Sequence, residues 1–402
     1  MPGRTNRSRA RSAAQLLVRN ALFTARLRRR PVRPPEVDPP ATEATRALPW
    51  LLRSGGAQVA LDGPASLLRR VAELFETPLE PAAGDRPHLR AVGRDGGAGW
   101  ELSVEGEAAR PVDRWSLAGP LLPPLTTAQL AAEPGWSHLH AGAAVRHGRA
   151  IVVPGASGAG KSVLTVLLAH GHGLLSDEVV AIDRAQGVLR ATPRPVSIKV
   201  RAHGPLTDVV PDDAPRDRQV WLAPSEVGTT AAGAVAPGLV VLPARDEGAE
   251  HATFEPIQRA EALEGLLANA FDLPRRPEER LADLAWLVAS SAVGRLRYAE
   301  AADAVGVLDA LAGADGPPVA AAAPVLVPVA DGGDGPRRSA EALSVVLDGR
   351  AVILHRTSRA VARLDPAGTE LWLRLDGRPH DAADPAFLAE LDDLDLIEGD
   401  LP

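Results

Sequence analysis

The chain has 402 residues, which is enough for one principal domain with one or two smaller ones and for a buried catalytic site. It contains no cysteine, and this excludes disulfides, thiolate zinc sites, iron–sulfur clusters and cysteine nucleophiles. The formal net charge of -7 at pH 7 argues against broad nucleic-acid binding, and no apolar run approaches the ~20 residues needed to span a bilayer. We therefore expect a cytoplasmic protein without a transmembrane segment and without nucleic acid as a partner.

The N-terminal part divides into two segments. The first 35 residues contain ten arginines and no acidic residue, and a proline-rich stretch follows them. We interpret residues 1–41 as a disordered basic arm and spacer, with contact to an anionic membrane and docking to a partner as the alternatives. Residues 42–134 alternate short apolar runs with turn residues around one helix-like stretch, which predicts a small α+β subdomain.

The rest of the chain predicts a nucleotide-binding core, a linker and a small module. Residues 135–312 have the pattern of an α/β core, with helices expected at 259–271, 277–293 and 299–311. Frequent Pro and Gly at 313–340 indicate a linker with few contacts across it. The module at 341–402 is expected to begin with a hairpin at 343–352 that turns at Asp348 and Gly349, followed by helices at 366–375 and 385–396.

A glycine-rich motif in the core predicts a phosphate-binding loop, or P-loop. The motif matches G-x-x-x-x-G-K-[ST] at every specified position, between an expected strand at 150–153 and an expected helix at 163–169. In such a loop, backbone N–H groups surround the phosphates, the lysine reaches the β- and γ-phosphates and the hydroxyl binds Mg²⁺. The candidate nucleotide-binding residues are Gly155, Ala156, Ser157, Gly158, Ala159, Gly160, Lys161 and Ser162.

The residues before this loop predict a tight hairpin that brings a histidine to it. Apolar stretches at 139–145 and 149–153 flank His147 and Gly148, so residue i pairs with residue 295 − i. This register places His140 opposite Gly155, beside the phosphates. His140 is then a candidate for orienting a carboxylate or contacting phosphate, while a purely structural histidine is the alternative.

Two carboxylates follow the helix within a strand of buried type. Asp177 and Glu178 interrupt the apolar sequence 174–182, where acidic side chains are costly unless they bind Mg²⁺ or handle a proton. Neighbouring strand residues face opposite sides, so both can address a nucleotide only if the strand bulges or ends there. We take Asp177 as the preferred general base and Glu178 as the preferred metal-side carboxylate, with the reverse assignment open.

Four cations farther along the chain are weaker candidates. Arg194, Lys199 and Arg201 lie around a short expected strand, and Arg245 ends another. They would neutralise transferred phosphate or bind an acidic substrate. Ordinary solvated surface charge is the alternative.

Together, His140, the sequence GASGAGKS and the LLSDEVV strand resemble the HPr kinase/phosphorylase-like family, whose fold is similar to that of phosphoenolpyruvate carboxykinases. This resemblance covers about 45 residues. It implies an α/β P-loop kinase core, phosphorylation of a protein serine by ATP, Asp177 as proton acceptor and His140 as its neighbour. The family's paired aspartates are replaced here by Asp177 and Glu178, and its downstream Gly-rich signature is missing. The resemblance therefore implies neither phosphorylase activity nor HPr as the substrate, and is greater to the HPr-kinase-related proteins of peptide-modification systems.

The C-terminal residues 344–397 resemble PqqD-like peptide-recognition domains through VVLDGRAVILHRTSRAVARLDPAGTELWLRLDG. Such domains are winged-helix-like modules that bind a leader peptide as an added β-strand. A plain packing domain is the alternative interpretation of this segment.

These features predict an ATP- and Mg²⁺-dependent kinase that phosphorylates a serine hydroxyl of a protein or peptide, with Ser162, Glu178 and Asp177 on the metal. A leader peptide bound by the C-terminal module is the expected partner in a peptide-modification pathway. The alternative is a regulatory or peptide-recognition scaffold that binds nucleotide without phosphotransfer. Homo-oligomer formation stays open.

Overall fold

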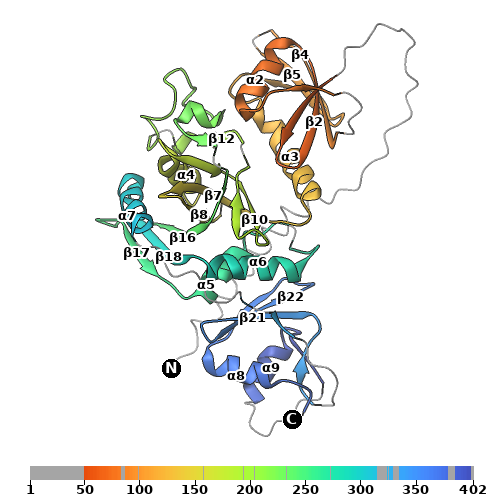
Figure 1. The fold of residues 1–402 in the computed structure, drawn as a ribbon, viewed down its shortest axis with the longest axis vertical. Coiled ribbons are helices and arrows are strands. Elements are labelled where there is room, and N and C mark those ends of the chain that lie inside the picture. The colour runs from red at the N-terminus through yellow and green to blue at the C-terminus, as the bar shows by residue number, and fades with distance from the viewer. Residues whose placement is uncertain are drawn as a thin grey trace, which may run out of the picture. The chain divides into compact units, whose positions relative to one another are not determined.

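The protein is a mixed α/β structure with several sheets (Figure 1). The computed structural model describes residues 49–82, 87–97, 99–156, 158–192, 194–202, 204–231, 233–271, 273–314, 324, 326–328, 335–378 and 385–399. The expected basic arm and most of the expected linker lie outside these residues. Two compact units are present, of which the first contains the described residues up to Pro134 together with 194–202 and 210–227. The second unit contains the other described residues.

The first unit is a six-stranded sheet, in the order β3-β1-β2-β4-β5-β6, that packs with helices α2 and α3 around one apolar core. A two-stranded sheet of β12 and β13 completes it. Its elements are β1 (Trp50–Ser54), β2 (Ala57–Asp62), α2 (Ala65–Phe75), β3 (Glu80–Pro81), β4 (Leu89–Asp95), β5 (Trp100–Val104), β6 (Arg110–Val112), α3 (Ala118–Ala132), β12 (Val196–Ile198), η1 (Val200–Ala202), β13 (Val220–Leu222) and η2 (Pro224–Val227).

Buried polar contacts attach the later segments to this first unit. Arg194 is 2% exposed and donates to the Thr126 hydroxyl at 2.6 Å and to the Gln129 side chain, both on α3. Arg70 of α2 donates to Glu226 at 3.0 Å. The compact units therefore follow different boundaries from the expected domains at 42–134 and 135–312, because residues distant in sequence share these contacts.

The second unit contains a ten-stranded sheet, a four-stranded sheet and a two-stranded sheet. Its elements are β7 (Ser137–Arg146), β8 (Arg149–Pro154), α4 (Lys161–Ala169), β9 (Gly173–Ser176), β10 (Val179–Asp183), β11 (Val188–Arg190), β14 (Thr230–Ala231), β15 (Ala234–Val235), β16 (Pro237–Arg245), β17 (Thr253–Pro256), α5 (Arg259–Leu267), α6 (Pro277–Ala289), β18 (Ala292–Tyr298), α7 (Ala301–Gly313), β19 (Leu326–Val327), β20 (Arg337–Arg338), β21 (Ala342–Leu347), β22 (Arg350–His355), β23 (Val361–Arg363), α8 (Pro366–Arg374), α9 (Pro385–Asp392) and β24 (Ile397–Glu398).

Strand β7 lies in the middle of the large sheet, whose order is β15-β11-β10-β7-β8-β16-β18-β17, with β9 also paired to β7. Small residues let helix α4 approach this strand closely. A Cβ atom added to Gly142 would lie 1.9 Å from the Thr165 hydroxyl of α4, so only glycine fits at this crossing. Helices α5 and α6 pack on the other face of the sheet (Figure 1).

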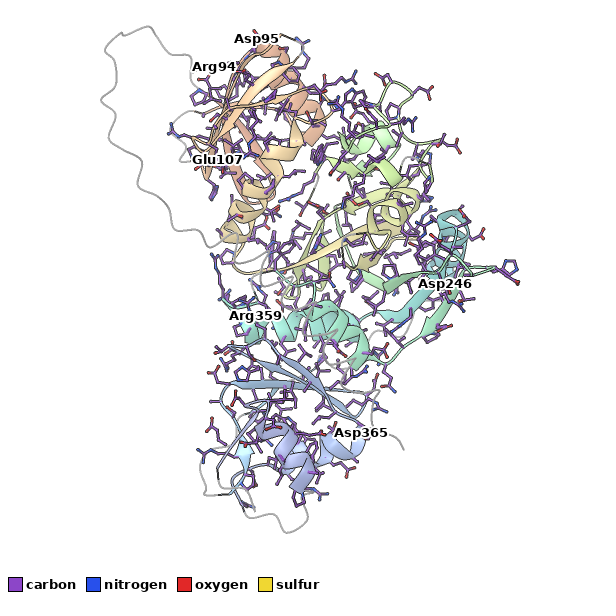
Figure 2. All side chains as sticks on the ribbon, turned by 180° about the vertical axis from the view of Figure 1, so that it is seen from behind. Arg94, Asp95, Glu107, Asp246, Arg359 and Asp365 are labelled. Carbon is purple, nitrogen blue, oxygen red and sulfur yellow. The ribbon has the colours of Figure 1, made fainter. Side chains whose placement is uncertain are left out.

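Three of the helices expected in this unit end earlier than predicted, and one of them, expected at 385–396, ends at Asp392. The helix expected at 277–293 ends at Ala289, because the chain re-enters the sheet as β18 and pairs with β16 and β17. The helix expected at 259–271 ends at Leu267, because residues 269–271 hydrogen-bond to β7. In the C-terminal module, the hairpin turn at Asp348 and Gly349 is confirmed by pairing of Leu347 with Arg350. Asp365, labelled in Figure 2, caps the N-terminus of α8, and its side chain accepts a hydrogen bond of 2.7 Å from the Gly368 N–H.

The C-terminal module shares its core with the large sheet's helices. Strands β21 and β22 contribute apolar side chains to the same cluster as α5 and α6, and Figure 1 shows these helices between the two sheets. Arg259 of α5 also pairs with Asp348 at 3.0 Å. Removing the module would expose an apolar helix surface, so the expectation of few contacts across the linker does not fit this packing.

This shared core predicts that the module and the large sheet unfold together. Leu354 of β22 is fully buried in the cluster, so Leu354→Ala should lower the free energy of unfolding by about 2–5 kcal/mol. Calorimetry should show a single shifted transition for the unit. The control Leu373→Ala, at a position that is 44% exposed on α8, should change stability by less than about 0.5 kcal/mol. A separate low-temperature transition in Leu354→Ala would contradict the shared core.

Candidate functional site

The glycine-rich motif forms a loop between a strand and a helix. Strand β8 ends at Pro154 and helix α4 begins at Lys161, which confirms the strand and the helix expected on either side. Gly155 and Gly160 have φ angles of 153° and 88°, which other residues rarely adopt. Ser157 lies outside the described residues.

Two glycines of this loop have little or no room for a side chain. A Cβ atom on Gly160 would lie 2.1 Å from the Tyr298 hydroxyl, and one on Gly155 would lie 3.3 Å from the Ala159 Cβ. The Tyr298 hydroxyl donates a long hydrogen bond of 3.4 Å to the Ala159 carbonyl. The sequence carried no signal for Tyr298, because it stands at the end of a strand that periodicity did not predict. The loop therefore has the close-packed backbone that a phosphate cradle requires.

Lys161 lies over the loop that precedes it. Its side chain is 8% exposed, and its ammonium group donates to the Gly155 carbonyl at 2.6 Å and to the Ala156 carbonyl at 3.4 Å. The N-terminus of α4 begins at the same residue and adds the partial positive charge of its N–H groups. A fixed cation and a helix N-terminus together give this position the positive potential that suits an anion.

The hairpin before the loop has the register that the sequence predicts. Six pairs, from Ala141 with Pro154 to Arg146 with Arg149, join β7 and β8, and each pair sums to 295. The pairing does not continue to His140. The His140 N–H instead donates to the Asn269 carbonyl at 2.8 Å, and the His140 ring lies 5.8 Å from the Phe271 ring. Residues 269–271 therefore lie beside His140, where the expected register placed Gly155. Gly155 does not reach this position because the chain leaves the strand there and enters the glycine-rich loop.

The strand that carries the two carboxylates breaks at them. Strand β9 ends at Ser176 and β10 begins at Val179. The Ser176 hydroxyl accepts from the Glu178 N–H at 3.3 Å and from the Val179 N–H at 3.0 Å, which shapes the bend. Asp177 is 2% exposed, whereas the Glu178 side chain is exposed. The two carboxylates therefore have different surroundings.

The strand end before the glycine-rich loop and the two carboxylates lie on opposite sides of the same residues of β7. Pairing of Ala143 with Ser176 and of His140 with Val179 leaves residues 177–178 opposite 141–142 of β7. Across β7, residues 141–142 pair with Val153 and Pro154, immediately before the loop. Strand spacing places the two backbone segments about 10 Å apart. His140 and Gly142 are two residues apart on β7, so they face the same side of the sheet. This is the side that α4 covers.

The side-chain oxygens of the site could hold Mg²⁺ only if phosphate oxygens supplied further ligands. No group of three or more His, Cys, Asp or Glu that would hold a metal ion occurs among the described residues. Mg²⁺ is usually held by one or two carboxylates, with phosphate oxygens and waters completing its six ligands. The Ser162 hydroxyl and the carboxylates of Asp177 and Glu178 are donors of this kind.

The candidate cations are distributed over both units. Arg194, Lys199 and Arg201 belong to the first unit, where Arg194 is buried against α3 and Lys199 is exposed. Arg245 ends β16, a strand parallel to β8, where it pairs in register with Tyr298. Asp246, labelled in Figure 2, follows it and accepts from Arg297 Nε at 2.7 Å. Hydrogen bonds from the Gly248 N–H and from Arg297 lower the pKa of the Asp246 carboxyl. Of these four cations, Arg245 is therefore the one that lies in the large sheet.

Comparison with protein-family models and with curated proteins gives no match for this chain. Within the part of the chain that the structure describes, no helix combines the length and the apolar character needed to cross a membrane.

The chain has two lysines, Lys161 and Lys199. If the loop binds phosphate, Lys161 should contribute to ATP binding and Lys199 should not. Lys161→Met removes the charge but keeps most of the aliphatic stem, and should weaken ATP binding at least ~10-fold, since charged hydrogen bonds contribute ~1.5–3 kcal/mol each. Titration calorimetry measures the affinity. Lys199→Met, at the other lysine, is the matched control and should bind ATP like the parent. Equal affinities in both variants would remove Lys161 from phosphate binding.

Proposed function

We propose that this chain is an ATP- and Mg²⁺-dependent kinase that phosphorylates a serine hydroxyl of a protein or peptide, with a P-loop core of the HPr kinase type. One observation carries the proposal. The strand end that leads into the glycine-rich loop and its lysine, and the segment that carries the buried Asp177, flank the same two residues of β7. Phosphoryl transfer requires this combination of an anion-binding loop and a nearby group that accepts the hydroxyl proton.

The residues of the loop bind and orient the phosphates in this proposal. A bound nucleoside triphosphate with Mg²⁺ would supply the phosphoryl group. Lys161 and the N-terminus of α4 attract the phosphate chain, and Ser162 and Glu178 would hold the metal. The exposure of Glu178 suits a metal ligand that shares the ion with water and phosphate, so the contrast with Asp177 favours the assignment of Glu178 to the metal side.

Asp177 takes the proton in this proposal. The serine oxygen bonds to the γ-phosphorus, the bond from that phosphorus to the β–γ bridging oxygen breaks, ADP leaves, and the hydroxyl proton moves to the Asp177 carboxylate. Burial of Asp177 keeps bulk water from competing for the same position. His140 lies on the face of β7 that α4 covers, and in this proposal it orients this carboxylate.

A proton-accepting role predicts the behaviour of Asp177→Asn. The variant should bind ATP like the parent and lose at least ~10²-fold in the rate of transfer to serine peptides, because a positioned base contributes on that scale. Transfer from γ-labelled ATP to a panel of serine peptides measures the rate. Glu178→Gln is the matched control and should instead raise the Mg²⁺ concentration needed for half-maximal rate.

Two outcomes of this experiment would decide against the proposal. Equal turnover by Asp177→Asn and the parent would remove Asp177 from the base role. A parent protein that binds ATP but labels no peptide would be a nucleotide-binding scaffold, not a kinase.

We further propose that the C-terminal module binds the peptide substrate at β23. Its sheet has the order β19-β21-β22-β23, and β19 already pairs with residues 344–345 of β21. Among the described residues, no strand pairs with the outer edge of β23. The Leu364 N–H and the Ala360 carbonyl bond to β22, so by alternation the backbone groups of Val361 and Arg363 face outward. An added peptide strand would pair with these groups.

Edge pairing predicts a selective effect of proline at position 363. Arg363→Pro removes an outward N–H and should raise the KM for a leader-containing peptide without lowering kcat. Arg363→Ala is the matched control, since it keeps the N–H and loses only the ion pairs with Glu261 at 3.4 Å and Glu264 at 3.7 Å. Steady-state kinetics with variable peptide separate the two parameters. If both variants raise KM equally, the side chain and not the strand edge binds the peptide.

A further inference from the structure

Tyr298 is the only tyrosine of the chain, and it contacts the glycine-rich loop from the sheet. It ends β18, its side chain is 2% exposed, and its hydroxyl donates to the Ala159 carbonyl at 3.4 Å. The same hydroxyl would lie 2.1 Å from a Cβ atom on Gly160, the residue before Lys161. The phenol thus touches the last turn of the loop before α4.

The sheet, and not the loop, determines where this hydroxyl lies. Tyr298 pairs in register with Arg245 of β16, and its carbonyl accepts from the Asp246 N–H at 2.8 Å. The neighbouring Leu296 on the same face is fully buried. Because the backbone of Tyr298 is held on this side, its hydroxyl is a fixed point against which the loop packs.

The charge state of the phenol is also determined by its surroundings. Burial raises the pKa of Tyr298 above the ordinary 10.0, and the positive charge of Arg245 opposes this only in part. The phenol therefore stays neutral at physiological pH and keeps its proton for donation. Because the folded-state pKa is raised, its contribution to stability is complete below about pH 10 and is lost as the pH rises through the folded-state value.

We propose that Tyr298 is a positioning residue for the nucleotide, whose hydroxyl holds the Ala159–Gly160 turn of the loop in the shape that binds phosphate. The Ala159 carbonyl accepts from the phenol, and in this proposal its oxygen is thereby kept from facing the bound phosphate. This inference rests on the proposed nucleotide binding. It adds to that proposal a residue that lies more than 130 positions beyond the motif.

The test removes only the hydroxyl. Tyr298→Phe keeps the buried ring, and should raise the dissociation constant for ATP with Mg²⁺ about three- to tenfold, as expected for one hydrogen bond. Its KM for ATP should rise by the same factor with kcat within about twofold of the parent. Arg295→Gln is the matched control, because Arg295 lies on the same strand and pairs with Glu261 at 2.7 Å on the α5 side.

Calorimetric titration and steady-state kinetics measure these values, and thermal unfolding checks the fold. A parent that binds ATP and a Tyr298→Phe variant that binds it equally well would overturn the inference while leaving the proposed function intact. A parent that binds no triphosphate would overturn both. A lowered melting temperature with unchanged ATP affinity would show that Tyr298 acts only in packing.

A spectroscopic measurement uses the single tyrosine directly. Protein labelled with meta-fluorotyrosine should give one fluorine resonance, which should shift when ATP and Mg²⁺ are added to the parent and stay unshifted in Lys161→Met at the same concentration. A resonance that does not respond to ATP in a parent that binds it would show that the phenol is insensitive to loop occupancy, and would also count against the inference.

Discussion

The arrangement of the site depends on the hydrogen bonding of one strand, β7, on both of its edges. One edge pairs with β8, which leads into the glycine-rich loop, and the other pairs with β9 and β10, which carry the carboxylates at their break. Antiparallel register is set residue by residue, so the loop and Asp177 reach the same level of the sheet. Gly142 at this level lets α4 lie directly on β7.

The same helices that cover the large sheet also support the C-terminal module. Because α5 and α6 bury side chains against both the ten-stranded sheet and the β21–β22 hairpin, their positions are fixed from two sides. A peptide captured on β23 would therefore be held by a module that shares its core with the sheet carrying the glycine-rich loop. In such an arrangement, substrate capture orients the peptide as well as raising its local concentration.

The loop is held in shape by contacts within the motif and by one group outside it. Its lysine is bonded to loop carbonyls, and its last turn packs against a phenol whose position is set by β16 and β18. Preorganisation of this kind lowers the conformational cost of ligand binding. Asp177 is buried and Glu178 is exposed, although they are neighbours in the sequence. The bend at Ser176 places their carboxylates in different environments.

The local features follow from the sequence alone: the strand–loop–helix around the glycine-rich motif, the hairpin register of β7 and β8, and the turn at Asp348 and Gly349. They depend on residues a few positions apart, whose conformational preferences can be read from the residue types. Long-range packing places residues 194–202 in the first unit, residues 269–271 beside His140 in place of Gly155, and Tyr298 against the loop. Each of these results from packing between segments distant in sequence, for which hydrophobic periodicity provides no pairing information.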